Sequence, residues 1–101
     1  MDKVRIGYLE FTIKEFPEGF GLRLDGETNF TRQTIHLDQN NSPEVRANTL
    51  LHEIMHVCWA MAALNDEDKE ERIVTALANG LSQVIRDNPD AAAYIIDGLK
   101  T

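Results

Sequence analysis

The sequence predicts a single α+β domain over residues 1–101, with a small, mostly antiparallel three-stranded sheet, a helix pair and a short C-terminal helix. Near residue 42 the chain changes from alternating apolar and polar residues to longer stretches with helical periodicity. Strands that precede the helices, instead of alternating with them, are typical of an α+β domain. A chain of 101 residues is long enough for one modest hydrophobic core.

Three strands are expected in the first half of the chain. The first covers residues 4–13, where the apolar residues change parity near Gly7, which we interpret as a bulge or bend. Residues 20–24 alternate again and precede an Asp-Gly turn signal at positions 25–26. A last short strand is expected over residues 34–38. Short turns between the strands favour antiparallel pairing, and a helix would cover one face of the sheet.

Three helices are expected in the second half. Ser42 is a good N-cap and Pro43 suits the first helical position, so the first helix should cover residues 43–64. It is apolar on nearly all sides, which predicts a buried helix. The second helix should cover residues 67–86, and Pro89 should begin a short third one.

The composition excludes several classes of partner. The formal net charge is −7, so the chain offers no basic patch for nucleic acid or for an anionic membrane surface. No apolar run approaches the roughly 20 residues that cross a bilayer, and the N-terminus does not read as a signal peptide. The single cysteine, Cys58, fits a reducing compartment and should be buried among apolar neighbours. We therefore expect a cytoplasmic protein.

The residues that carry chemistry are His52, Glu53 and His56, an H-E-x-x-H pattern within the first helix. Residues four apart lie on one face of a helix, so both imidazoles can reach one cation, and neutral imidazole is an ordinary Zn²⁺ ligand. Glu53 is offset by about 100° from His52, where it can take a proton from a water activated by zinc. The flanking residues are apolar, and buried polar groups need partners, which a metal would supply.

A catalytic zinc site needs a third protein ligand. His36 is the only other histidine and lies in the strand expected at 34–38. The carboxylates at the start of the second helix are the other candidates, because a short turn can return that helix beside His56. Helical periodicity does not choose between Glu70 and Glu71 or their neighbours at positions 67 and 68.

Two segments resemble the small zincin metallopeptidases of bacteriophages and prophages, which are related in pattern to ImmA/IrrE-type minimal gluzincins. They are residues 49–56, Thr-Leu-Leu-His-Glu-Ile-Met-His, and residues 70–81, Glu-Glu-Arg-Ile-Val-Thr-Ala-Leu-Ala-Asn-Gly-Leu. The resemblance implies a zincin-like helix pair that binds one Zn²⁺ per chain, with Glu71 as the third ligand and Glu70 as the close alternative.

The resemblance also implies a substrate-binding strand and a reaction. The strand before the motif helix should be an edge strand that borders the cleft and pairs with an extended peptide, through Thr34, Ile35 and Leu37. His36 and Tyr94 are the candidates for binding an oxyanion.

The expected function is a zinc metallopeptidase that acts on a peptide or protein substrate, in the host cytoplasm if the gene belongs to a phage. The alternative is a non-catalytic zinc-binding module that regulates or binds another protein. The sequence carries no signal for the oligomeric state.

Overall fold

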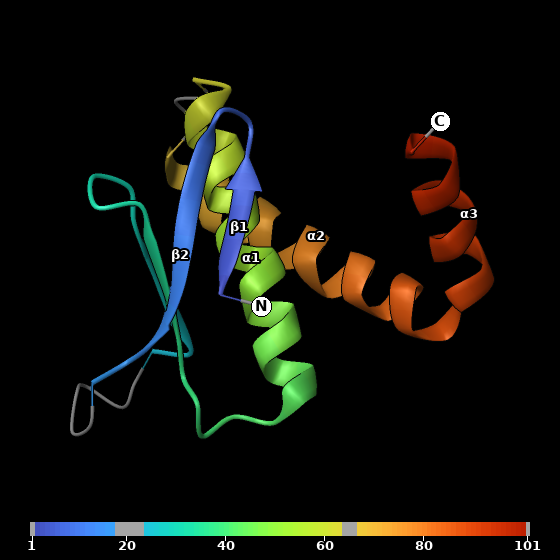
Figure 1. Ribbon diagram of the computed structural model, residues 1–101, viewed down its shortest axis with the longest axis horizontal. Helices are drawn as coiled ribbons and strands as arrows, with labels where there is room; N and C mark the ends of the chain where they lie inside the picture. The colour runs from blue at the N-terminus through green and yellow to red at the C-terminus, as the bar shows by residue number, and fades with distance from the viewer. Residues whose placement is uncertain (1, 18–23, 64–66, 101) are drawn as a thin grey trace.

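The computed structural model describes residues 2–17, 24–63 and 67–100 and has an α+β architecture (Figure 1). A four-stranded sheet packs against α1, and α2 packs against α1 and continues away from the sheet to α3. The elements in chain order are β1 (Lys3–Ile6), β2 (Leu9–Glu15), β3 (Gly26–Asn29), β4 (Thr34–Leu37), α1 (Pro43–Met61), α2 (Glu67–Asp87) and α3 (Pro89–Leu99).

The sheet is mixed, and its strand order is β1-β2-β4-β3. β1 pairs antiparallel with β2, and β3 pairs antiparallel with β4, but β2 and β4 run parallel. The prediction of an α+β class is confirmed, whereas the prediction of three antiparallel strands needs correction. The parallel pair arises because β3 and β4 form a hairpin that joins the edge of β2 through its second strand.

The parity change near Gly7 marks a tight turn instead of a bulge within one strand. Ile6 pairs with Leu9, so only Gly7 and Tyr8 connect β1 to β2. Gly7 has a φ of 61°, a conformation that two-residue hairpins require at their first loop position. Since both strands are apolar on the face toward the core, the alternation looked like one strand with a local irregularity.

The second predicted strand, at residues 20–24, falls partly outside the described residues, because residues 18–23 are not among them. Leu24 lies outside any strand, and the next strand is β3, at Gly26–Asn29. The sequence assigned positions 25–26 to a turn, because Asp-Gly is a strong turn signal. Pairing with β4 overrides that local preference. The strand predicted at residues 34–38 is confirmed as β4.

The helices follow their sequence signals closely. Ser42 caps α1, its hydroxyl accepts a hydrogen bond from the Val45 amide at 3.3 Å, and Pro43 occupies the first turn. α1 ends at Met61, three residues before the predicted end, and α2 and α3 begin where they were predicted. None of the described helices combines the length and the apolar character that a membrane-crossing segment needs.

Two sets of contacts hold α1 in place. On the sheet side, the core residues Ile6, Phe11, Ile35 and Val57 pack together. On the other side, Val74 and Ala78 of α2 are buried, and the Asn48 amide of α1 donates to the Ala78 carbonyl and to Ser82 Oγ, at 3.3 and 2.9 Å. Cys58, which was predicted to be buried, is exposed, because it follows the buried Val57 around the helix.

We expect Ile35→Ala to lower the free energy of unfolding by about 2–5 kcal/mol, because Ile35 is fully buried between β2, β3 and α1. Urea denaturation followed by circular dichroism measures the change. The control is Tyr8→Ala, which removes a side chain on the exposed hairpin turn and should change the stability by less than about 0.5 kcal/mol. Equal effects of the two variants would contradict this description of the core.

Candidate metal centre

The two histidines of the motif face one another on adjacent turns of α1. Their ring centroids are 4.8 Å apart with an interplanar angle of 67°, and their Nε2 atoms are 3.1 Å apart. This is the arrangement that an i, i+4 pair adopts when both rings turn toward a common point. Both side chains are about four-fifths buried, so their ring nitrogens need partners from the protein or from a ligand.

The first turns of α2 bring a carboxylate to the same point. Glu71 Oε1 lies 3.0 Å from His52 Nε2, and Glu71 Oε2 lies 2.9 Å from His56 Nε2. Within the described part of the chain, His52, His56 and Glu71 form a group that can hold a metal ion. The Glu71 side chain is 67% exposed, so the group is open to solvent on the α2 side.

Glu70 contacts the opposite nitrogen of the His56 ring. Its Oε2 atom lies 2.6 Å from His56 Nδ1. A carboxylate at this position accepts a hydrogen bond from Nδ1–H, which leaves the lone pair of a neutral ring on Nε2. Carboxylates commonly orient metal-binding histidines in this way. Glu70 therefore directs the free nitrogen of His56 toward His52 and Glu71.

This tautomer makes the centre a site for a cation. The lone pair on His56 Nε2 faces the Glu71 carboxylate at 2.9 Å, and a carboxylate has no proton to donate. Two acceptors at that distance repel one another unless a proton or a metal ion lies between them. Around a tetrahedral zinc with bonds of about 2.0–2.1 Å, ligand atoms stand about 3.3 Å apart, close to the 2.9–3.1 Å found here. The donor set thus fits zinc in composition and in spacing.

Glu53 points about 100° around α1 from His52, toward β3 of the sheet. Its side chain is 7% exposed, and the Thr28 hydroxyl of β3 donates a hydrogen bond of 2.6 Å to Glu53 Oε1. Thr28 faces α1 because it pairs with Ile35, a core residue. This bond holds the carboxylate between α1 and β3. It uses Oε1, so Oε2 is the oxygen that Thr28 does not bond.

The structure separates the two glutamates that the sequence left open. Glu71 lies beside both histidine Nε2 atoms, as the resemblance implied, and Glu70 lies behind one ring. The difference arises because consecutive helical residues point about 100° apart. The side chains at positions 67 and 68 lie outside the described part of the structure.

The prediction of an edge strand at residues 34–38 is wrong. β4 lies between β2 and β3, so Thr34, Ile35 and Leu37 belong to a strand that is paired on both sides. The edge strand on this side of the sheet is β3, which the sequence did not predict. β3 and β1 are therefore the edge strands of the described sheet.

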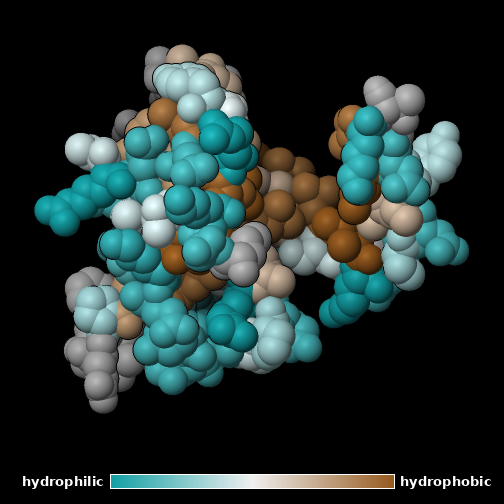
Figure 2. All heavy atoms as spheres, viewed as in Figure 1, coloured by the Kyte–Doolittle hydropathy of each residue, from teal (hydrophilic) through white to brown (hydrophobic). Residues whose placement is uncertain are grey.

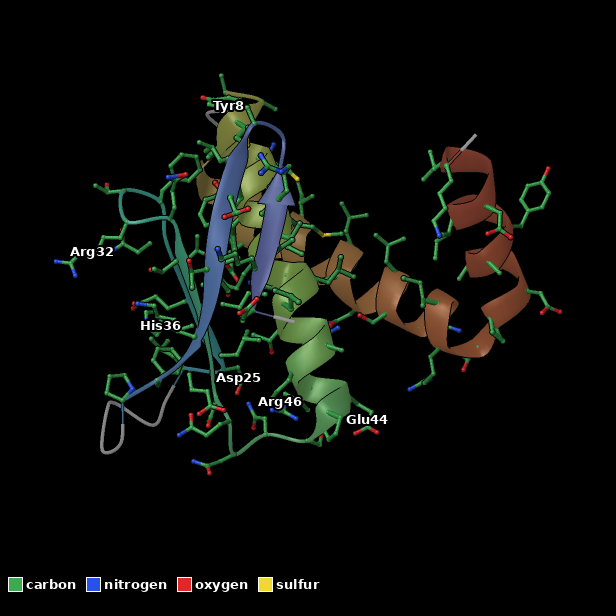
Figure 3. All side chains as sticks on the ribbon, viewed as in Figure 1. Tyr8, Asp25, Arg32, His36, Glu44 and Arg46 are labelled. Atoms are coloured by element: carbon green, nitrogen blue, oxygen red, sulfur yellow. The ribbon has the colours of Figure 1, made fainter. Side chains whose placement is uncertain are left out.

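Neither candidate for binding an oxyanion lies at the centre. Ile35 faces α1, so His36 projects from the opposite face of the sheet, where its ring stacks on Phe16 with a centroid distance of 5.3 Å (Figure 3). Tyr94 is 82% exposed and belongs to α3, which contacts α2 alone among the described elements. Alternation along β4 and the direction of α2 decide these placements, so both predictions are corrected.

Sequence reasoning missed two contacts of the motif. These are the bond from Thr28 to Glu53 and the contact of Glu70 with Nδ1 of His56. No local signal identifies Thr28, because its position depends on the pairing of β3 with β4. The contact of Glu70 could have been predicted once Glu71 was assigned as the ligand. The residue before Glu71 points about 100° away around α2, where it can reach the Nδ1 atom of a histidine that binds metal through Nε2.

Comparison with known families identifies one match. The family model described as IrrE N-terminal-like domain (Peptidase_M78) matches residues 11–98, which include every residue of the centre described above. No curated protein and no solved structure matches the chain.

We expect Glu71→Ala and Glu70→Ala to weaken zinc binding unequally. Glu71→Ala removes a ligand atom beside both Nε2 atoms, and its zinc affinity should fall more than that of Glu70→Ala, for which about 10–100-fold is expected because only the orientation of His56 is lost. Competition with a chromogenic zinc chelator measures both affinities. Equal and negligible losses would place the third ligand elsewhere.

Proposed function

We infer the function of this chain from its family and its site: it belongs to the IrrE N-terminal-like domain family (Peptidase_M78), and we propose that it is a zinc-dependent peptidase. His52, His56 and Glu71 hold one zinc ion, and Glu53 is the general base. The observation that carries the proposal is the convergence of two imidazole nitrogens and one carboxylate on a single point, with Glu70 behind one ring.

The ion supplies Lewis acidity, which activates a water molecule and polarises the carbonyl of the scissile bond. Three protein ligands are the number that catalytic zinc sites use, and a zinc ion held by them would have a position left for water or substrate. The side of the centre formed by Glu71 is open to solvent, so a substrate can approach it. The chain's own residues must then position the base and the peptide.

Glu53 is suited to accept a proton. The Thr28 hydroxyl donates a hydrogen bond of 2.6 Å to its Oε1, so the carboxylate cannot rotate freely. The same bond therefore fixes the direction in which Oε2 points. Burial at 7% exposure keeps bulk water from solvating the carboxylate, which strengthens its interaction with a nearby proton donor. The proton is transferred from the attacking water to Glu53 and then to the leaving amine.

β3 gives the substrate a place to bind. Its outer edge has no strand partner in the described sheet, so an extended peptide can add to it through backbone hydrogen bonds. Thr28 and Glu53 then lie under the added strand, because Thr28 faces α1.

We expect Glu53→Gln to keep the zinc affinity and to lower peptide hydrolysis by about 10²–10⁴-fold, because an amide cannot accept the proton. A peptide library, read by mass spectrometry with wild type and variant side by side, measures the hydrolysis. Zinc content from elemental analysis is the control. Cleavage at the wild-type rate in the variant would rule out the peptidase mechanism, and zinc binding without wild-type cleavage would favour a non-catalytic zinc module.

We expect Thr28→Val to lower kcat by about tenfold without changing zinc affinity, because it removes the hydrogen bond that orients Glu53 and keeps the shape of the side chain. Thr28→Ser retains a hydroxyl and should restore most of the activity. Steady-state kinetics on a peptide cleaved by the wild type separates kcat from KM. A loss that is the same in the serine and valine variants would show that Thr28 acts through packing alone.

A further inference from the structure

β3 turns two of its residues toward α1, and one of them is a glycine. Gly26 and Thr28 are two residues apart, so they lie on the same face of the strand. Gly26 pairs with Leu37, which packs against the core, and Thr28 pairs with a core residue. Figure 2 shows mainly hydrophilic atoms over the part of the molecule that holds the strands, which fits a sheet whose apolar face is turned toward α1.

The backbone at Gly26 does not require a glycine. A positive φ, which glycine adopts most readily, occurs at Gly7 but not at Gly26. Gly26 is the first residue of β3, and a glycine in a strand contributes no side chain to the packing of the sheet. The reason for a glycine at this position therefore lies in the space around it.

The space beside Gly26 is filled by α1 and β4. A methyl group on Gly26 would lie 2.5 Å from Thr49 Cγ2, well inside the separation of about 3.5–4.0 Å that carbon atoms prefer. It would also lie 3.1 Å from the His36 carbonyl oxygen and 3.4 Å from Glu53 Oε2. Thr49 is β-branched and 7% exposed, so its methyl group has little freedom to move away. The absence of a side chain is what lets β3 lie this close to α1.

The two residues of β3 that face α1 meet the two oxygens of one carboxylate. The Thr28 hydroxyl donates to Glu53 Oε1 at 2.6 Å, and Gly26 stands beside Oε2. Because a side-chain contact of about 3.6 Å is no longer a hydrogen bond, an outward shift of β3 by about 1 Å would break the bond from Thr28. Thr49 and Glu53 are four residues apart on α1 and both are buried, so they form the surface on which β3 rests.

We propose that Gly26 is a positioning residue for Glu53. Because Gly26 has no side chain, β3 lies close enough to α1 for Thr28 to reach Oε1, and that bond sets the direction of Oε2. Gly26→Ala pushes β3 away from Thr49, and the bond between Thr28 and Glu53 is lost. The consequence for proton transfer rests on the proposed peptidase function, whereas the loss of the bond does not.

Urea unfolding of the two single variants and the double variant tests the loss of the bond without any need for activity. Thr28→Val leaves the buried Glu53 without its donor and should lower the urea midpoint. Gly26→Ala should lower the midpoint as well, and adding Thr28→Val to it should have little further effect, because the bond is already lost. Additive losses, or a Gly26→Ala midpoint at or above the wild-type value, would overturn the proposal.

Thr49→Ser provides the matched compensating change, because it removes the methyl group with which Gly26→Ala collides. Combined with Gly26→Ala, it should recover most of the lost midpoint and restore the effect of Thr28→Val. The combined variant also carries the test if Gly26→Ala does not fold. A combined variant that is no more stable than Gly26→Ala, or that does not fold, would overturn the proposal. Glu27→Ala, at an exposed position on the opposite face of β3, is the control and should leave the effect of Thr28→Val unchanged.

Steady-state kinetics on a peptide that the wild type cleaves tests the catalytic consequence. Gly26→Ala should lower kcat about tenfold at unchanged zinc affinity, as expected for Thr28→Val, because both changes act through one hydrogen bond. The double variant should be no slower than either single variant, and Thr49→Ser should restore the kcat of Gly26→Ala. A wild-type kcat in Gly26→Ala would overturn the positioning role. No cleavage by the wild type would remove the peptidase proposal and with it this role, while the urea experiment still decides the contact.

Discussion

The site depends on one electrostatic constraint: two imidazole nitrogens and a carboxylate from two helices meet within hydrogen-bond distance. His52 Nε2, His56 Nε2 and the Glu71 carboxylate are 2.9–3.1 Å apart, and Glu70 takes up the other nitrogen of His56. Lone pairs brought this close repel one another unless a proton or a metal ion lies between them. The packing of Val74 and Ala78 and the Asn48 hydrogen bonds keep α1 and α2 together against that repulsion, so binding of a cation and stability of the helix pair are coupled.

α1 distributes its polar residues between two neighbours. Its histidines face α2, which contributes carboxylates, and Glu53 faces β3, which contributes the Thr28 hydroxyl. The three motif residues are each half-buried or buried, and each has a partner in one of the two neighbouring layers. A small domain can in this way use five consecutive positions of one helix to face two different elements.

α2 carries two surfaces of different character (Figure 1). Its first turns provide Glu70 and Glu71 to the centre, and along its length the helix exposes an apolar row made of Ile73, Leu77, Leu81 and Ile85. The apolar row cannot be explained by folding of one chain, because the residues that fix α2 to α1 are Val74 and Ala78 on a neighbouring side.

Sequence alone determined the local features whose physics is local. Ser42 and Pro43 mark the start of α1, and His52 and His56 share a helix face, with Glu53 about 100° away, because of a fixed rise and rotation per residue. Tertiary structure decided which glutamate meets the histidines, that β4 is internal and β3 is the edge, and that Thr28 holds Glu53. These outcomes depend on strand pairing and helix docking between residues far apart in the chain. Such contacts are set by the free energy of the whole core, which no short segment encodes.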